Sequence, residues 1–269
     1  MKVAVSNIAW PVEQDVAVAE TLARLGVSGI EVAPTKVWPT PLGVTDAEMD
    51  AYRRFWESRG IRIVAAQALL FGRPDLTLFD EAETRERTLD YLTGIIRVCA
   101  RLGARSLVFG SPKNRQTGGR DRASVWPIAV DFFGRLGEAA AKEETAVVME
   151  ANPPEYGADF VTRTSEAIEL VRDVNHPGFR LHMDTACMSL AGDDPDTLIA
   201  QGHPLLAHFH ASEPNLTPVC EGTTDHARFA RCLASSSYRG WVSIEMRQVD
   251  PFDVQNISRA VKLVTALYR

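Results

Sequence analysis

A short apolar run followed by an amphipathic helical stretch recurs from one end of the chain to the other. The apolar runs predict eight strands, at residues 3–10, 29–34, 61–70, 106–112, 146–152, 179–187, 206–212 and 241–247. Strands that alternate with helices pair in parallel through right-handed crossovers. Eight such units within 269 residues predict an α/β fold, a (β/α)8 TIM barrel, with residues 1–269 forming a single domain.

The helical stretches carry recognisable start and stop signals. Thr45 and Glu48 have the spacing of a capping box, and Gly26, Gly60 and Gly103 stand where helices are expected to end. Long apolar-periodic stretches cover residues 83–102, 126–141 and 251–268. An open doubly wound sheet is the alternative architecture, but no GxGxxG follows the first strand, so the usual phosphate-binding fingerprint of that fold is missing.

The composition and charge of the chain argue against nucleic acid and membranes as binding partners. The formal net charge is −6 and the basic residues are scattered, which argues against nucleic acid. The apolar run at the N-terminus is too short for a signal peptide or a membrane span, so we expect a cytoplasmic protein with no membrane partner. The four cysteines lack metal-ligand spacing and are expected to be reduced. A homo-oligomer is compatible with the sequence.

Four of the predicted strands end in an acidic or imidazole side chain within an otherwise apolar run. These residues are Glu150 in VVMEAN, Asp184 in LHMDTAC, His210 in AHFHAS and Glu245 in VSIEMR. Any one of them alone could be a hydrogen-bonded core residue or the partner of an arginine. Buried carboxylates are costly unless they are paired or bind a cation, so the four together predict one divalent metal ion. The oxygen-rich donor set favours Mn²⁺, Mg²⁺ or Co²⁺, with Zn²⁺ possible.

Alternation along a strand indicates which of these side chains point inward. The four polar residues share the inner face, so we expect Met149, Met183, Phe209 and Ile244 to face the helices. His182 and His208 lie one pleat deeper on the inner face. They are expected to orient the ligands rather than to bind the metal.

The chain resembles the xylose isomerase-like TIM barrel superfamily of sugar isomerases and epimerases, which includes D-tagatose 3-epimerase and hydroxypyruvate isomerase. The likeness covers essentially the whole chain and is most specific in VVMEANPP, LHMDTAC, HFHASEPN and YRGWVSIEM. It implies that Glu150, Asp184, His210 and Glu245 are the metal ligands and that the substrate is a small carbohydrate-like molecule. One departure is Cys187, which stands where sugar epimerases of this group carry a substrate-contacting His. Cys187 is either a packed small residue or a contact to an altered substrate.

The resemblance implies proton transfer at a carbon next to a carbonyl, through a metal-stabilised enediolate. Glu150 and Glu245 are the candidate acid/base pair. Alternatively they only hold the metal, and the reaction is a hydride shift or a dehydration by a metal-dependent lyase. A barrel that only binds a ligand is a further alternative. An activity like that of endonuclease IV needs a His-rich metal cluster, whereas the three remaining histidines fall away from the strand ends: His176, His203 and His226.

Substrate contacts are expected in the loops that follow the strands, since in a barrel these all lie at the C-terminal mouth. Asn152 and Glu155 resemble positions where relatives bind sugar hydroxyls. Three cations could clamp a phosphate or carboxylate from the rim, or simply be solvated there: Lys113, Arg115 and Arg247. Aromatic residues that follow the early strands could form an apolar wall: Trp10, Trp38 and Phe71.

Overall fold

The eight predicted strands form a closed barrel in a computed structural model that describes all 269 residues. Every neighbouring pair is parallel, and Val3 of the first strand pairs with Val242 of the last, which excludes an open sheet. The strands are β1 (Lys2–Ser6), β2 (Gly29–Val32), β3 (Arg62–Ala66), β4 (Ser106–Phe109), β5 (Ala146–Met149), β6 (Phe179–Asp184), β7 (Leu206–Ser212) and β8 (Trp241–Glu245). The predicted (β/α)8 TIM barrel is confirmed.

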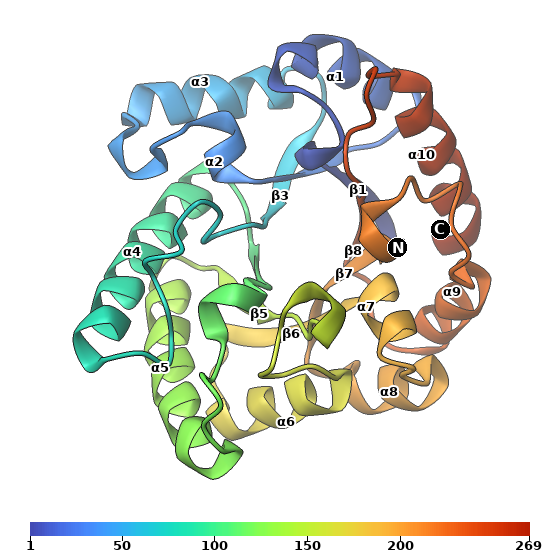
Figure 1. Cartoon of the computed structure of the whole chain (residues 1–269). Coiled ribbons are helices and arrows are strands. Elements are labelled where there is room, and N and C mark those ends of the chain that lie inside the picture. Colours follow the sequence, from blue (N-terminus) through green and yellow to red (C-terminus); the bar gives the residue numbers. More distant parts are fainter.

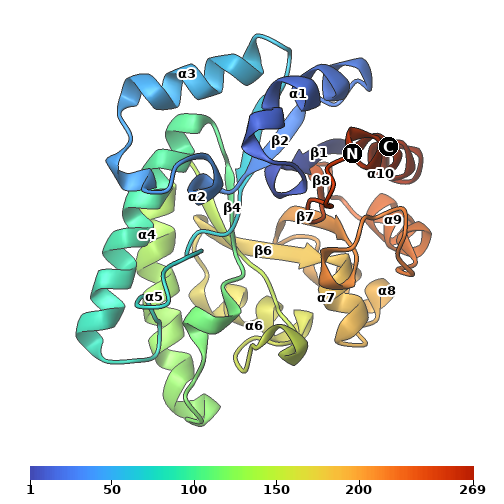
Figure 2. The same cartoon turned by 45° about the horizontal axis from the view of Figure 1, so that its top comes forward.

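Helices surround the barrel as an outer ring, seen from one end of the barrel in Figure 1 and tilted in Figure 2. They are α1 (Asp15–Arg24), α2 (Pro34–Val37), α3 (Asp46–Glu57), α4 (Ala82–Leu102), α5 (Arg122–Lys142), α6 (Thr164–Val174), α7 (Thr185–Leu190), α8 (Pro195–Gly202), α9 (His226–Ser235) and α10 (Val254–Tyr268). Short 3-10 turns lie in the loops at η1 (Asn7–Ala9), η2 (Val12–Gln14), η3 (Pro41–Gly43), η4 (Pro112–Arg115), η5 (Pro154–Tyr156) and η6 (Pro214–Leu216). None of the helices combines the length and the apolar character that crossing a membrane requires.

Side-chain caps decide where the helices begin. The capping box predicted for α3 is present, because the Glu48 backbone N–H donates to Thr45 Oγ1 and the Thr45 backbone N–H donates to Glu48 Oε2. Helix α5 starts earlier than periodicity predicts, because the Asp121 side chain accepts from the Ser124 backbone N–H. Helix α10 starts later than predicted, at the cap formed by Asp253.

Most strands end earlier than their apolar runs predict, although their starts agree to within one residue. At β3 the left-handed backbone of Ala68, with φ of 55°, turns the chain out of the sheet. At β6 the Asp184 side chain caps helix α7, so Cys187 lies in a helix and not in the predicted strand extension. The remaining apolar residues of these runs therefore help to build the loops at the mouth.

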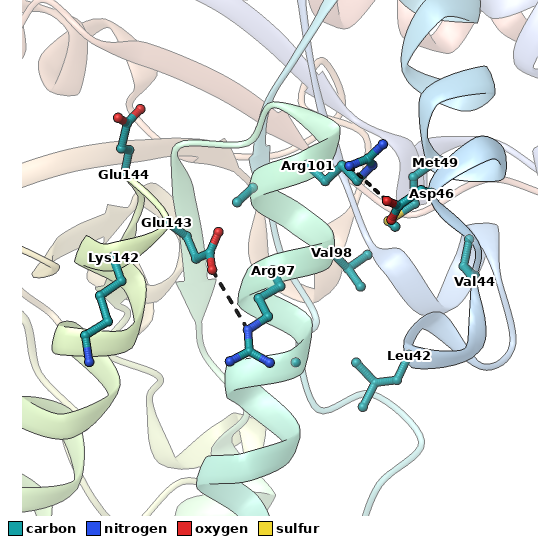
Figure 3. A pocket seen from close by; sticks show the side chains of 12 residues that line it. Leu42, Val44, Asp46, Met49, Arg97, Val98, Arg101, Lys142, Glu143 and Glu144 are labelled. Carbon is teal, nitrogen blue, oxygen red and sulfur yellow. Dashed lines mark ion pairs between the residues drawn. The ribbon is translucent and has the colours of Figure 1, made fainter.

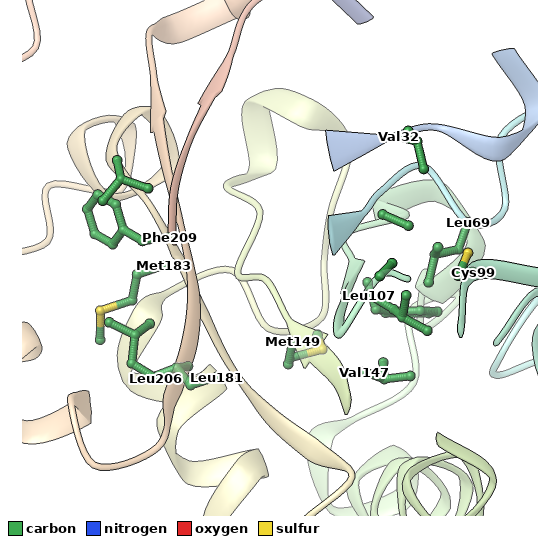
Figure 4. Packing of buried hydrophobic residues seen from close by; sticks show 14 of the residues in the cluster. Val32, Leu69, Cys99, Leu107, Val147, Met149, Leu181, Met183, Leu206 and Phe209 are labelled. Atoms are coloured by element: carbon green, nitrogen blue, oxygen red, sulfur yellow. The ribbon is translucent and has the colours of Figure 1, made fainter. Parts of the chain in front are cut away.

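The barrel and its helices share one apolar layer. Met149, Met183, Phe209 and Ile244, expected to face the helices, all belong to a single cluster of 67 buried residues. Figure 4 shows the first three of these side chains within that cluster. The predicted alternation is therefore correct, and the polar residues that alternate with these positions are directed to the barrel axis.

Candidate metal centre

The four residues predicted as ligands meet at the C-terminal ends of β5 to β8. His210 is at the centre of the group. Its Nδ1 atom lies 3.3 Å from Glu245 Oε2 and 3.8 Å from both Glu150 Oε1 and Asp184 Oδ2. The side chains of His210 and Asp184 are almost completely buried, whereas those of Glu150 and Glu245 retain 12% and 15% exposure. The centre is thus accessible from the side of the two glutamates.

Neighbouring groups hold two of the carboxylates in place. Asp184 Oδ1 accepts the Cys187 backbone N–H at 2.6 Å, and Asp184 Oδ2 accepts the Ser212 hydroxyl. Glu150 Oε2 accepts the side-chain amide of Asn152 at 2.6 Å. Each carboxylate therefore has its orientation fixed by short-range contacts and still directs an oxygen toward His210.

Glu31 also belongs to this centre, although it is not among the residues predicted from the sequence. It lies in β2, is fully buried, and its Oε2 atom is 2.9 Å from His210 Nε2 and 3.4 Å from His208 Nε2. Burial opposes its ionisation, but His210 and His208 hold the pKa of Glu31 well below its ordinary value. The signal was available, because a lone carboxylate in the apolar run GIEV resembles the four that were recognised.

Gln67 is the second missed residue. It follows β3 directly, and its side-chain amide donates to Glu245 Oε1 at 2.6 Å. A neutral amide at the end of a strand is common, so Gln67 cannot be recognised as a metal-centre residue from the sequence alone. Gln67 therefore holds one carboxylate oxygen of Glu245, just as Asn152 holds one oxygen of Glu150.

The carboxylates of the centre are crowded and largely buried, and a bound cation would stabilise their charged forms. Burial, with the charges of Asp184 and Glu245, raises the pKa of Glu150 to about 8. Burial and Glu245 also raise the pKa of Asp184. His210 Nδ1 is buried without a hydrogen-bond partner, although its Nε2 is held by Glu31. A divalent cation would use that lone pair and neutralise the crowded carboxylates, so this donor set fits one.

The two deeper histidines differ from each other. His208 contacts Glu31, in keeping with the expected orienting role. His182 has no hydrogen-bond partner on either ring nitrogen, and its Nε2 lies 3.3 Å from Glu150 Oε1. The other three histidines are away from the centre, as expected. His226, for example, begins α9 and lies between Tyr268 and the buried Glu213.

A cavity of about 420 Å³ opens onto the centre. Of the predicted substrate contacts, Asn152, Cys187 and Arg247 line it, whereas Glu155 and Lys113 are exposed and do not. The remaining lining includes residues that were not predicted, among them Tyr156, Ser212, Asn215 and Leu216. Burial, together with Asp184 and Glu150, raises the pKa of the Cys187 thiol well above its ordinary value.

Arg115 corrects an expectation. Its position after β4 predicts a cation on the rim that could clamp an anion, but the side chain is completely buried. Its Nη1 donates to the backbone carbonyl of Glu150 at 2.9 Å, and its Nη2 donates to Asn152 Oδ1 at 2.9 Å. Arg115 therefore fixes the β5 end that carries Glu150 and does not face the cavity.

The predicted aromatic wall is wrong for Trp10. That side chain is fully buried, packs against Trp56, and donates to Asp15. Trp38 packs edge-on against Tyr52. Only Phe71 is strongly exposed, at 72%, and it lines a second cavity of about 400 Å³ with Lys113. Pro112 lines both this cavity and the one at the centre, so the two are neighbours.

A larger hollow of about 770 Å³ lies elsewhere, beside α4 and the ends of α3 and α5 (Figure 3). Its charged side chains neutralise one another, as in the Arg97–Glu143 and Arg101–Asp46 ion pairs. It contains no cluster of metal-ligating side chains and no unpartnered buried histidine. Size alone does not make it the functional site.

Comparison with known proteins agrees with this architecture. The family profile described as xylose isomerase-like TIM barrel matches residues 19–266. No curated protein matches the chain in sequence. Among solved structures, D-psicose 3-epimerase with D-tagatose from Clostridium cellulolyticum H10 is similar, with a TM-score of 0.83, 16% identity and 100% coverage of both chains.

Two further structures show the same likeness. The 3-keto-D-glucoside 4-epimerase from E. coli has a TM-score of 0.80 at 18% identity. The IOLI protein with a bound zinc atom has a TM-score of 0.77 at 17% identity. In both comparisons 99% of each chain is covered. At this level of identity the likeness concerns the fold.

Proposed function

The chain belongs to the xylose isomerase-like TIM barrel family, and from that premise we propose that it is a divalent-metal-dependent isomerase or epimerase. The reaction is proton transfer at a carbon next to the carbonyl of a sugar, a sugar phosphate or a related keto or hydroxy compound. The observation that carries the proposal is the unpartnered, buried Nδ1 of His210, which faces the carboxylates of Glu150, Asp184 and Glu245 within 3.8 Å.

Glu150, Asp184, His210 and Glu245 would hold the cation. A divalent cation bound there would polarise the carbonyl of the substrate and lower the free energy of the enediolate. The chain's own residues determine the ligand geometry, since Glu31 leaves only Nδ1 of His210 free, and Asn152 and Gln67 each occupy one oxygen of a glutamate.

Glu150 and Glu245 are the proposed acid/base pair. They come from the separate strand ends β5 and β8, and both line the cavity. Each has one oxygen held by an amide, so the position of its carboxylate is fixed while a proton is taken or returned. Removal of either carboxylate therefore has to affect both metal binding and proton transfer.

The substrate is proposed to be about the size of a monosaccharide. A cavity of about 420 Å³ lies within the usual range for small-molecule sites. Similar folds include proteins whose structures are described as D-psicose 3-epimerase and 3-keto-D-glucoside 4-epimerase. Arg247 in the cavity lining and Lys113 in the neighbouring cavity are the cations available to a phosphate or carboxylate.

A metal-dependent lyase or dehydratase is the second candidate. The observation that favours it is Cys187, which lines the cavity where sugar epimerases of this group carry a His. Elimination and epimerisation both begin with the removal of a proton next to the carbonyl. In elimination a leaving group then departs from the next carbon. An endonuclease activity is not proposed, because the net charge is −6 and the centre lacks additional surrounding histidines from the loops.

The test is isotope exchange. The protein is incubated with Mn²⁺ in D₂O and a panel of ketoses, ketose phosphates and keto acids, and deuterium next to the carbonyl is followed by NMR. We expect exchange with one class of compound, loss of exchange in Glu245→Gln, and no loss in Glu20→Gln, a control on the exposed face of α1. Deuterium incorporation accompanied by loss of water indicates the dehydratase. Absence of exchange in all compounds despite bound metal contradicts the proposal.

A further inference from the structure

We propose that His182 is a direct ligand of the cation, so that the centre offers two imidazoles, His182 and His210, where the sequence pattern indicates one. The inference rests on the proposed metal-dependent function and concerns a residue outside the four-residue ligand set. It assigns to His182 a role different from the orienting one that its position in β6 suggested.

The imidazole ring of His182 is buried without a hydrogen-bond partner. The side chain has 0% exposure, and neither ring nitrogen has a hydrogen-bond partner. A neutral imidazole carries one N–H donor and one lone pair, and buried polar atoms of this kind are nearly always satisfied. Each of the other five histidines has at least one partnered ring nitrogen: His176, His203, His208, His210 and His226. His182 is therefore the histidine whose partner is missing.

The distance between His182 Nε2 and the nearest carboxylate oxygen of Glu150 is that of two ligands of one ion. His182 Nε2 lies 3.3 Å from Glu150 Oε1, but the contact lacks hydrogen-bond geometry. Two ligand atoms bound to one ion at about 2.0–2.2 Å lie roughly 3–3.6 Å apart when they are neighbours in the coordination sphere. The spacing is thus that of two atoms which share an ion. An orienting histidine would instead donate its N–H to the carboxylate.

His182 also converges with three of the proposed ligands on one small volume. One ligand atom from each of Glu150, His182, Asp184 and His210 can be chosen so that all four lie within 4.8 Å of one another. The rings of His182 and His210 approach to 4.2 Å between centroids at an interplanar angle of 74°. His182 therefore shares one small volume with three of the four proposed ligands and is not confined to the layer beneath them.

A second imidazole changes which metal the centre prefers. Imidazole nitrogen suits Zn²⁺, Cu²⁺ and Ni²⁺, whereas Mg²⁺ and Mn²⁺ favour oxygen ligands. We therefore expect this chain to select later transition metals more strongly than three carboxylates and one histidine would. Loss of a residue that only supports a ligand typically weakens metal binding about 10–100-fold. Removal of His182 should weaken the binding of Zn²⁺ by more than this and that of Mg²⁺ much less.

The experiment counts the coordinated imidazoles directly. Protein labelled with ¹⁵N-histidine is loaded with one equivalent of Zn²⁺, and long-range ¹H–¹⁵N correlation spectra identify ring nitrogens whose shifts change on binding. Two metal-bound rings are expected in the wild-type protein and one in His182→Leu. His203→Leu is the matched control, since His203 is bound to Ser237 and lies outside the centre. Competition titrations with Zn²⁺ and Mg²⁺ give the change in selectivity.

The wild-type count decides the question even if His182→Leu does not fold, and His182→Gln then serves to assign the second ring. One shifted ring in a zinc-loaded protein overturns the role of His182 and leaves the proposed function intact. An equal loss of Zn²⁺ and Mg²⁺ affinity in the variant also overturns it, because a packing role affects both ions alike. Failure to bind any divalent cation removes the proposed function together with the inference.

Discussion

Glu31 Oε2 lies 2.9 Å from His210 Nε2, which joins β2 to β7 through the interior of the barrel. The contact occupies one nitrogen of the His210 ring and leaves Nδ1 facing the three carboxylates. A histidine whose second nitrogen is held in this way has a fixed tautomer and ring orientation, and its basicity as a ligand is raised.

Glu31→Gln should therefore weaken metal binding about 10–100-fold while the four proposed ligands remain unchanged. The amide keeps the size of the side chain but removes the charge that His210 and His208 stabilise. Competitive titration with a chromophoric chelator measures the change. Glu20→Gln, an exposed change on α1, is the control, and equal affinities in the two variants would refute the role given to Glu31.

Arg115 and Lys113 form a matched pair, since they lie in the same turn with opposite burial. Arg115→Met should lower the free energy of unfolding by about 2–4 kcal/mol, because it leaves the Glu150 carbonyl and Asn152 Oδ1 without their donor. Lys113→Met should change it by less than about 0.5 kcal/mol. Urea unfolding of both variants checks the contrast, and a stable Arg115→Met protein contradicts it.

Metal binding at neutral pH should release protons. The pKa of Glu150 is raised to about 8 by burial and by Asp184 and Glu245, so without metal this carboxyl is largely protonated, whereas a ligand must be deprotonated. Affinity should rise with pH through the pKa of Glu150. Although burial opposes it, Glu31 and Glu245 raise the pKa of His210 well above its ordinary value, so this ring also releases a proton when Nδ1 binds metal. Calorimetry in two buffers of different ionisation enthalpy gives the number of protons. A buffer-independent heat at neutral pH would be the contrary result.

Stability should fall as the solution becomes acidic, in part because of His226. Burial lowers the pKa of this ring below its ordinary value of 6.5, so the unfolded state binds the proton more readily than the folded state. Its contribution is complete above 6.5 and is lost as the pH falls toward the folded-state pKa. Unfolding free energies measured across this range should depend less on pH in His226→Gln. Parallel profiles for the two proteins would contradict this assignment.

Cys187 should react slowly with iodoacetamide although it lines the cavity. Burial, Asp184 and Glu150 raise the pKa of its thiol, and the thiolate is the reactive form. Mass spectrometry of partly alkylated protein should show Cys220, which is only half-buried, modified before Cys187. The reverse order would indicate an activated thiol and a chemical role for Cys187.

The sequence predicted the barrel and the four proposed ligands because both follow from short-range periodicity. Side chains on one strand alternate with a period of two, and the ends of parallel strands meet at one mouth. The roles of Glu31 and Gln67 depend on partners in distant strands. The lone carboxylate in GIEV indicates that Glu31 belongs to a polar site but not that it contacts His210, and Gln67 has no such local signal. The burial of Arg115 is likewise decided by how its turn folds onto β5, which a loop sequence does not specify.

All four proposed ligands come from β5 to β8, whereas Glu31 and Gln67, which hold His210 and Glu245, come from β2 and β3. The C-terminal half contains the donors and the groups that hold Glu150 and Asp184, but the groups that hold His210 and Glu245 come from the N-terminal half. If the chain were divided between β4 and β5 into two separately produced polypeptides, the C-terminal fragment alone would lack the side chains that orient His210 and Glu245. Tight metal binding should then be recovered only when the two fragments reassemble, so metal affinity measures fragment complementation.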